Sequence, residues 1–377
     1  MGRVSIVRVE TKSEENEFIK LPWKIYKEDS CWVPPIISEF RKTIRGENNM
    51  LSKSGTFALI LAYKDGIPSG RLCVGINEHL NHAKNYKEGY ISLFECIDDD
   101  DIARALFQYA EDWLRKRGME KIIGPLSVPG GDDYRGLLID NFVDPTLVMN
   151  TYNKEYYKRF FEDHGFIKYL DCYGYKVDIC HGMDERYEKY IPYAMNKYHF
   201  KVDKLNLKNI NKDMRDIKKI IDDAMPKEWE DFIPPTDEEI EIIANQLVPV
   251  ADPDLIYIAR TCDGRPIGFN VALPDYNEIL RKMNGRLFPF GFLRFLFDKR
   301  KISRTRFFVL FVIPEYRKKG VSAAIYRNVY RAAVDKGYKY GEGSTIWEYN
   351  EVMMRDIERF GGIKYKTYRI YKKGIND

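Results

Sequence analysis

Short apolar runs and longer stretches with helical spacing follow one another along the chain, most clearly between residues 307 and 337. Seven apolar residues from Phe307 to Ile313 predict a buried strand. Apolar residues at helical spacing then run from Val321 to Gly337, where the pattern stops, and they predict a helix over 321–336. A basic turn joins the two, so its backbone amides come directly before the predicted helix.

The turn contains three cations and a glycine, Arg317, Lys318, Lys319 and Gly320. A helix start offers unpaired N–H groups that bind phosphate, and neighbouring cations add to that attraction. Glycine allows the backbone to approach a ligand without a Cβ. The turn therefore predicts a phosphate site. The alternative is a solvated basic turn that only begins a helix.

A short motif occurs twice. Asp65-Gly66-Ile67-Pro68-Ser69-Gly70 recurs 198 residues later as Asp263-Gly264-Arg265-Pro266-Ile267-Gly268, each time between two strand-like runs. An Asp-Gly pair in this setting predicts a hairpin. Asn153 and Asn350, 197 residues apart, each precede a helical stretch that ends at glycine. The nearly equal offsets indicate a duplicated chain.

The duplication predicts an N-terminal module of residues 1–180 and a C-terminal module of residues 181–377. Each module reads as hairpin, strand, helix, strand, helix and strand, which is an α/β (α+β mixed) plan. We therefore expect two tandem modules, each with a mixed central β-sheet flanked by helices.

Composition narrows the classes of function. The net charge of +4 in 377 residues gives no case for nucleic-acid binding. The six cysteines have no C-x-x-C spacing and the five histidines no ligand cluster, so no metal site is predicted. The N-terminus does not read as a signal peptide, and the apolar stretch 287–297 is too short to span a membrane. We expect a cytoplasmic protein; the oligomeric state is not predicted.

These residues resemble the GNAT (N-acetyltransferase) superfamily. Val312-Ile313-Pro314 matches the strand end of its signature, Arg317 to Ser322 matches its cofactor loop, and Asn350 to Gly362 matches its last helix. Further motifs are similar to a two-module bacterial group of largely uncharacterised GNAT proteins. They include Trp32-Val33-Pro34-Pro35, Gly124-Pro125, Leu273-Pro274-Asp275-Tyr276-Asn277 and Lys366-Thr367-Tyr368-Arg369-Ile370-Tyr371.

The resemblance implies an acyl-CoA donor, most simply acetyl-CoA, bound by the C-terminal module. It implies that the pantetheine arm pairs with the strand end and that a backbone N–H near Val312 stabilises the oxyanion of the reacting thioester. The cofactor-binding residues that it implies are Leu310, Phe311, Val312, Arg317, Lys318, Lys319, Gly320, Val321, Ser322, Ala323, Asn350 and Met353.

Acyl transfer to an amine needs a base that takes the amine proton. Glu342, on the strand before the last helix, is the first candidate and Glu348 the second; both are alternatively surface carboxylates. Many GNAT enzymes carry a tyrosine acid seven residues after the asparagine, where this chain has Ile357. Tyr349 or Tyr368 would replace it, or the thiolate leaves unaided, since an ordinary thiol has a pKa of only about 8.5.

The N-terminal module differs at the corresponding loop, where Asp98, Asp99, Asp100 and Asp101 replace the basic turn. Carboxylates repel a pyrophosphate but cap a helix well. We therefore expect this module to be structural or to build part of the acceptor site. The candidate substrate-binding residues are Tyr152, Asn153, Tyr156, Asp275 and Asn277.

An insertion at 277–303 is rich in apolar and basic residues. It reads either as a buried lid or packing helix, or as an acyl-chain channel with basic flanks near anionic lipid. The prediction for the whole chain is an acyl-CoA-dependent N-acyltransferase, most simply an acetyltransferase, acting on a small or lipid-like primary amine. The alternatives are transfer of a long acyl chain to a lipid-like amine, favoured by the insertion, and a non-catalytic CoA-binding sensor, favoured by Ile357.

Overall fold

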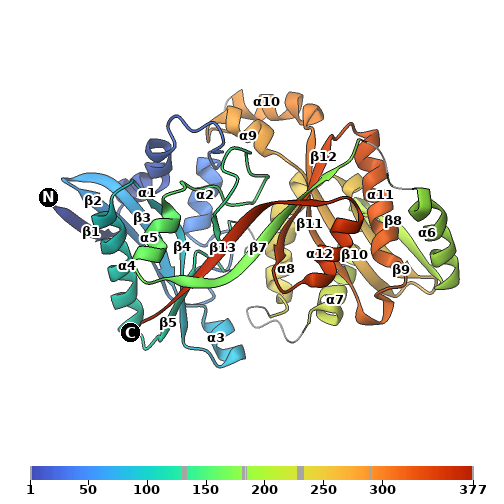
Figure 1. The fold of residues 1–377 in the computed structure, drawn as a ribbon, viewed down its shortest axis with the longest axis horizontal. Helices are drawn as coiled ribbons and strands as arrows, with labels where there is room; N and C mark the ends of the chain where they lie inside the picture. Colours follow the sequence, from blue (N-terminus) through green and yellow to red (C-terminus); the bar gives the residue numbers. More distant parts are fainter. Residues whose placement is uncertain are drawn as a thin grey trace. The chain divides into compact units, whose positions relative to one another are not determined.

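The computed structural model describes residues 2–129, 134–180, 183, 185–226, 233–287 and 290–375. The chain divides into two compact units (Figure 1). Unit 1 comprises Met1–Tyr173, Asn277–Asp298 and Lys366–Asp377, and unit 2 comprises Gly174–Tyr276 and Lys299–Tyr365. Each unit is a mixed sheet with helices, which confirms the predicted α/β fold class.

Unit 1 contains helices and strands from three parts of the chain. They are β1 (Val4–Arg8), α1 (Lys12–Ile25), α2 (Ile37–Ile44), β2 (Phe57–Lys64), β3 (Ile67–Gly75), α3 (Glu78–Lys84), β4 (Glu88–Cys96), α4 (Asp100–Arg115), β5 (Lys121–Gly124), β6 (Leu137–Leu138), α5 (Tyr157–Asp163), the first part of β7 (Ile167–Asp178), α9 (Asn277–Met283), α10 (Phe290–Asp298) and most of β13 (Ile363–Gly374).

The sheet of unit 1 runs β1-β2-β3-β4-β5-β13. The first four strands are antiparallel, β4 and β5 are parallel, and β13 is antiparallel to β5. Successive strand side chains point to opposite faces. Ile60 accordingly belongs to the same core cluster as Leu106 of α4, whereas its neighbour Leu61 packs in another cluster with Phe18 of α1. Both faces of the sheet are therefore covered.

Unit 2 repeats this plan with its own elements. They are the end of β7, α6 (Glu185–Lys197), β8 (Phe200–Lys204), α7 (Ile210–Ala224), α8 (Asp237–Leu247), β9 (Ile256–Thr261), β10 (Pro266–Pro274), β11 (Arg304–Val312), α11 (Val321–Asp335), β12 (Tyr340–Trp347), α12 (Glu351–Arg359) and the start of β13, with short 3-10 turns at Leu207–Asn209, Val248–Val250, Pro253–Leu255, Lys299–Lys301 and Pro314–Tyr316.

The strands of unit 2 are paired in the order β8-β9-β10-β11-β12. The first four are antiparallel and the last two parallel, as in β1 to β5. Gly66 and Gly264, in the two predicted hairpin turns, both have the left-handed φ (77° and 94°) that glycine accepts without strain. The tandem arrangement predicted from the repeated motif is confirmed.

The units are not two continuous halves. The last residues of the chain, from Lys366, belong to unit 1, and the end of β7, from Gly174, belongs to unit 2. Each unit therefore contains strand residues from the end of the other repeat. Module boundaries at 1–180 and 181–377 describe the repeat in the sequence, and as folding units they stay a prediction.

Candidate functional site

In unit 2, the pairing of β11 with β12 covers only the first part of β11 within the described residues, whereas its pairing with β10 covers nearly the whole strand. Its parallel register with β12 runs from Arg304–Tyr340 to Phe307–Gly343, and on its other side it stays paired with β10 as far as Val312. Within the described residues, the pairing of β11 with β12 thus ends at Phe307. The predicted pantetheine-binding residues, Leu310 to Val312, lie beyond that point.

The basic turn follows β11, as predicted. Lys318 and Gly320 have left-handed φ values of 61° and 84°, and Gly320 is the N-cap of α11. No side chain caps this helix, whose first turn contains Val321, Ser322 and Ala323. The N–H groups at a helix start carry partial positive charge. The start of α11 is therefore suited to an external anion.

The three cations of the turn differ in what they contact. Arg317 donates from Nε to the carbonyl of Val312 (3.2 Å) and from Nη2 to the carbonyl of Ala224 at the end of α7 (2.8 Å). Lys319 lies over the ring of Tyr316, 4.8 Å from its centroid. Lys318 is exposed. Arg317 thus holds the turn in place, and Lys318 is the better placed cation for a ligand.

Gly320 has a reason for being glycine that the sequence did not reveal. A Cβ at this position would lie 2.9 Å from the Cβ of Ala194 in α6. Its positive φ disfavours other residues as well. Close packing of α6 thus requires glycine here, whether or not a phosphate approaches.

The matching helix of unit 1, α4, is capped by the protein itself. Asp99 is the N-cap, and its carboxylate accepts hydrogen bonds from the N–H groups of Asp101 (3.1 Å) and Ile102 (3.4 Å). Lys64 pairs with the same carboxylate. This confirms the predicted capping role of the acidic loop. A carboxylate therefore occupies in unit 1 the place that α11 leaves open.

The end of β4 in unit 1, like the start of α4, has its polar groups bonded by the protein itself. Cys96 pairs with Gly70 as Val312 pairs with Gly268, so Cys96 is the counterpart of Val312. In unit 1 the Cys96 N–H donates to the hydroxyl of Tyr157 (2.9 Å), and Tyr156 donates to the Cys96 carbonyl (2.8 Å). Both polar groups of this strand end are thus satisfied internally.

Glu342 lies on β12, opposite Arg306 in the parallel register, and its side chain is fully buried. Its carboxylate accepts hydrogen bonds from the hydroxyls of Ser344 (2.5 Å) and Tyr365. Arg306, also buried, donates to the carbonyl oxygen of Ser344 at 3.1 Å and 3.3 Å. An unpaired buried charge is costly, so the hydroxyls of Ser344 and Tyr365 stabilise the Glu342 carboxylate in the interior.

Arg306 and Tyr365 were missed by the sequence reasoning. Arg306 directly precedes the apolar run 307–313, and Tyr365 is one of 27 tyrosines with no distinctive spacing. The available signal was a charged residue inside each of two neighbouring apolar strands, Arg306 and Glu342. Such residues are rare in buried strands unless they are paired.

Comparisons with known proteins support one fold. No family model matches the chain. It is 26% identical over 383 residues to a protein of Caulobacter vibrioides named bacterial ceramide synthase, covering 99% of this chain and 98% of that protein. It is 29% identical over 377 residues to Protein YghO of Escherichia coli, covering 97% and 94%.

Two solved structures extend over 99% of this chain. One is a tandem GNAT protein from the clavulanic acid biosynthesis pathway, with a TM-score of 0.60, 9% identity and 99% of its own chain covered. The other is a fungal multi-domain protein with a GCN5-related glucosamine N-acetyltransferase region, with a TM-score of 0.61 and 12% identity. This chain covers 38% of that longer protein. The chain has a tandem GNAT fold.

Other predicted residues of the GNAT site surround the start of α12. Asn350 is the N-cap, and its side chain accepts the N–H of Met353 (3.2 Å). Glu348 is half-buried, and Tyr349 is exposed and stacks on Trp347. The roles of all four residues in a reaction stay predictions.

Ile357, at the place of the GNAT tyrosine acid, is buried against Gly343, where an added Cβ would lie 2.2 Å from Ile357 Cδ1. Tyr368, one of the two suggested replacements, is fully buried and belongs to unit 1, whereas Glu342 belongs to unit 2. Ile357 thus has a packing role, because its buried side chain fills the space beside Gly343.

The candidate substrate-binding residues have polar contacts inside their own units. Asp275 pairs with Arg304 (2.5 Å) in unit 2. In unit 1, Asn153 bonds the N–H and carbonyl of Leu138 (2.7 and 3.1 Å), and Asn277 donates to the Thr146 carbonyl (3.0 Å). These contacts describe structural roles; substrate binding by the same residues stays a prediction.

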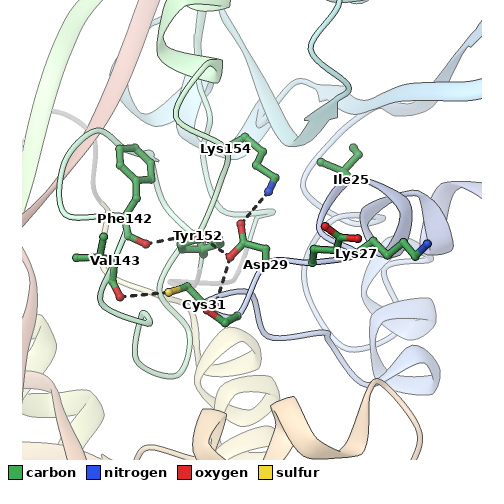
Figure 2. Close-up of a pocket in the computed structure, with 10 residues that line it drawn as sticks. Ile25, Lys27, Asp29, Cys31, Phe142, Val143, Tyr152 and Lys154 are labelled. Atoms are coloured by element: carbon green, nitrogen blue, oxygen red, sulfur yellow. Dashed lines mark hydrogen bonds and ion pairs between the residues drawn. The ribbon is translucent and has the colours of Figure 1, made fainter.

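Tyr152 lines a pocket of about 630 Å³ in unit 1 (Figure 2). Its hydroxyl donates to Asp29 (2.9 Å), which also pairs with Lys154 (2.8 Å). Burial alone would raise the pKa of Asp29, but the hydrogen bonds from Lys154 and Tyr152 lower it overall. The pocket wall therefore holds an ionised carboxylate whose charge Lys154 balances.

Among the described residues, no group of three or more His, Cys, Asp or Glu side chains is arranged to hold a metal ion. Nor does any helix in the described ranges have the length and apolar character needed to cross a bilayer.

Proposed function

We propose that the chain is an acyl-CoA-dependent N-acyltransferase in which unit 2 binds the donor. The contrast between the two helix starts carries the proposal. Asp99 caps α4 in unit 1, whereas no side chain caps α11 after its glycine N-cap. The pyrophosphate of coenzyme A is an anion that suits the open helix start.

The proposed donor extends from the start of α11 along β11. Its pantetheine amides pair with the backbone of Leu310 to Val312, beyond the point where the described register with β12 ends. In unit 1 the tyrosine pair 156–157 contacts the corresponding strand end, and the repeat places Met353 and Met354 at the matching positions. Unit 1 thus has no equivalent role in donor binding.

Glu342 is the proposed general base. The amine nitrogen attacks the thioester carbon, the new C–N bond forms, and the C–S bond breaks as coenzyme A leaves. The amine proton passes to Glu342 through the hydroxyl of the half-buried Tyr365 that contacts it, because Glu342 itself is fully buried. The proton is then returned to the thiolate, which restores the carboxylate.

The identity of the acyl group separates two versions of this function. The full-length relative named bacterial ceramide synthase supports a long-chain donor and a lipid-like amine, because a ceramide is the amide of a fatty acid and a long-chain amino alcohol. The glucosamine N-acetyltransferase region of the fungal protein, which shares the fold, supports acetyl transfer to a smaller amine. We favour the long-chain version, because the match with the protein named bacterial ceramide synthase covers 99% of this chain and 98% of that protein.

The test measures thiol release from palmitoyl-CoA and acetyl-CoA with a panel of amines that includes a long-chain amino alcohol. Amine-dependent release that is faster with palmitoyl-CoA is the expected result. Faster release with acetyl-CoA would favour the second version. Tight binding of coenzyme A without release for any amine would reject the enzyme and leave the CoA-binding sensor.

A further inference from the structure

Helix α10 presents an apolar face that the rest of the protein leaves exposed. Leu293, Leu296 and Phe297 are 50%, 42% and 74% exposed. Their spacing of three and four residues places them on one side of the helix. Three exposed large apolar side chains on one face of a helix form a contiguous apolar surface.

The preceding helix, α9, is seated firmly on unit 1. Ile279 and Met283 are buried, and Arg281 donates to the carbonyl of Ser30 (2.7 Å). The turn after α9 is held by Trp23, whose indole N–H donates to Asn284 (2.8 Å), and by Gly285, whose carbonyl accepts from Ile37 (3.0 Å). The segment before α10 is therefore held on unit 1 as far as Arg286, whereas Leu293, Leu296 and Phe297 are exposed.

Basic residues accompany this face. Within α9, α10 and the described turn residues there are four cations, Arg281, Lys282, Arg286 and Arg294, against two carboxylates, Glu278 and Asp298. All four cations are exposed. Exposed leucine and phenylalanine beside lysine and arginine are typical of helices that lie in the interface of an anionic bilayer.

We propose that the α10 face docks the protein on an anionic lipid surface. The α10 face comprises the apolar side chains of Leu293, Leu296 and Phe297 and the four cations Arg281, Lys282, Arg286 and Arg294. The apolar side chains enter the boundary between headgroups and acyl chains, and the cations contact lipid phosphates. A second copy of the chain fits less well, because a two-fold contact would bring the same cations together. The proposal does not depend on which acyl group the protein transfers.

The test uses the full-length protein and co-sedimentation with vesicles of phosphatidylcholine alone, or of one part phosphatidylglycerol to two parts phosphatidylcholine. We expect binding to the anionic vesicles that weakens as sodium chloride is raised. Leu293→Ser/Phe297→Ser should lower the partition coefficient about tenfold or more. Ile67→Ser, which changes an exposed residue of the β2–β3 hairpin in the same unit, is the matched control and should bind as the parent does.

A second pair of variants tests the electrostatic part. Lys282→Glu/Arg286→Glu should lower binding by about tenfold or more, whereas Lys20→Glu/Lys116→Glu, with exposed lysines elsewhere in unit 1, should not. Absence of binding to anionic vesicles at low salt would overturn the proposal. So would equal binding by the α10 variants and the controls, or a dimer in analytical ultracentrifugation that Leu293→Ser/Phe297→Ser dissociates.

Discussion

At residue scale, Glu342 is a buried carboxylate with hydroxyl donors from Ser344 and Tyr365. Glutamine keeps the shape of the side chain and can accept one of these two hydrogen bonds at its amide oxygen, but it cannot take a proton. Glu342→Gln should therefore lower kcat about 100-fold or more, with little change in the affinity for the acyl-CoA. Steady-state kinetics and calorimetric titration with coenzyme A measure the two effects.

Glu348→Gln is the matched control, since Glu348 is half-buried and follows the same strand. A larger loss of kcat for Glu348→Gln than for Glu342→Gln would transfer the role of base to Glu348. Thermal unfolding of both variants shows whether the buried network, rather than proton transfer, has been damaged.

A second residue-scale prediction concerns pH. Asp171 accepts hydrogen bonds from Nε (2.9 Å) and Nη2 (3.0 Å) of Arg369. Burial alone would raise the pKa of Asp171, but the hydrogen bonds from Arg369 and Lys168 lower it overall. The pair therefore stabilises the fold above the carboxylate's unfolded pKa of about 3.9, and this stability is lost as the pH falls through the lower folded value.

Asp171→Asn should accordingly lower the free energy of unfolding by about 1–3 kcal/mol at neutral pH, with the difference from the parent shrinking as the pH falls below the unfolded pKa of about 3.9. Urea unfolding between pH 7 and pH 2.5 measures it. Asp112→Asn, at a more exposed ion pair with Arg115 on α4, should change stability little at any pH. A difference for Asp171→Asn that persists at low pH would contradict the electrostatic account.

At element scale, the strand–turn–helix from β11 to α11 could be predicted because its pattern is local. The predicted helix 321–336 differs by one residue from α11, and the strand 307–313 lies mostly within β11. The pattern does not indicate which other helix or strand each element packs against. Nothing near Gly320 in the sequence indicates Ala194, because that contact depends on how α6 packs.

The start of α11 leads to an element-scale prediction. Ser322→Asp places a carboxylate in the first turn of α11, as Asp99 does at the start of α4. The change should stabilise the helix slightly and repel the pyrophosphate, so the Kd for coenzyme A should rise about tenfold or more. Isothermal titration calorimetry measures the Kd.

Ser322→Asn has nearly the same size as Ser322→Asp without the charge, and it should retain most of the affinity. Equal affinities for the two variants would place the pyrophosphate elsewhere. This pair is a cleaner test than a bulky residue at Gly320, which would clash with Ala194 and disturb the fold itself.

At the scale of the whole molecule, the repeat was visible in the sequence but the make-up of the units was not. An offset between motifs identifies which segments correspond, and it contains no information on which strand completes which sheet. Lys366 illustrates the point: it is fully buried in unit 1, where its ammonium donates to the carbonyls of Asn141 and Asp144 (both 2.7 Å). No nearby residue in the sequence predicts those partners.

The make-up of unit 1 predicts that residues 1–180 do not fold alone. The fragment lacks β13, including the buried Tyr368, Ile370 and Tyr371, and it leaves β5 without its antiparallel partner. We expect no cooperative thermal transition by circular dichroism. Adding residues 277–298 and 366–377 through flexible linkers should restore one. A cooperative transition in the fragment alone would show that the sequence repeat is itself a folding unit.

The caps of α4 and α11 also determine how the two repeats respond to the donor. Asp99 gives α4 a permanent counter-charge, so unit 1 is complete without a nucleotide. In unit 2, α11 has a glycine N-cap and no side-chain cap, so under the proposed function its counter-charge comes from the phosphates of the bound donor. The proposed function therefore implies that unit 1 keeps the same stability with or without the donor, and that the stability of unit 2 rises with the concentration of acyl-CoA.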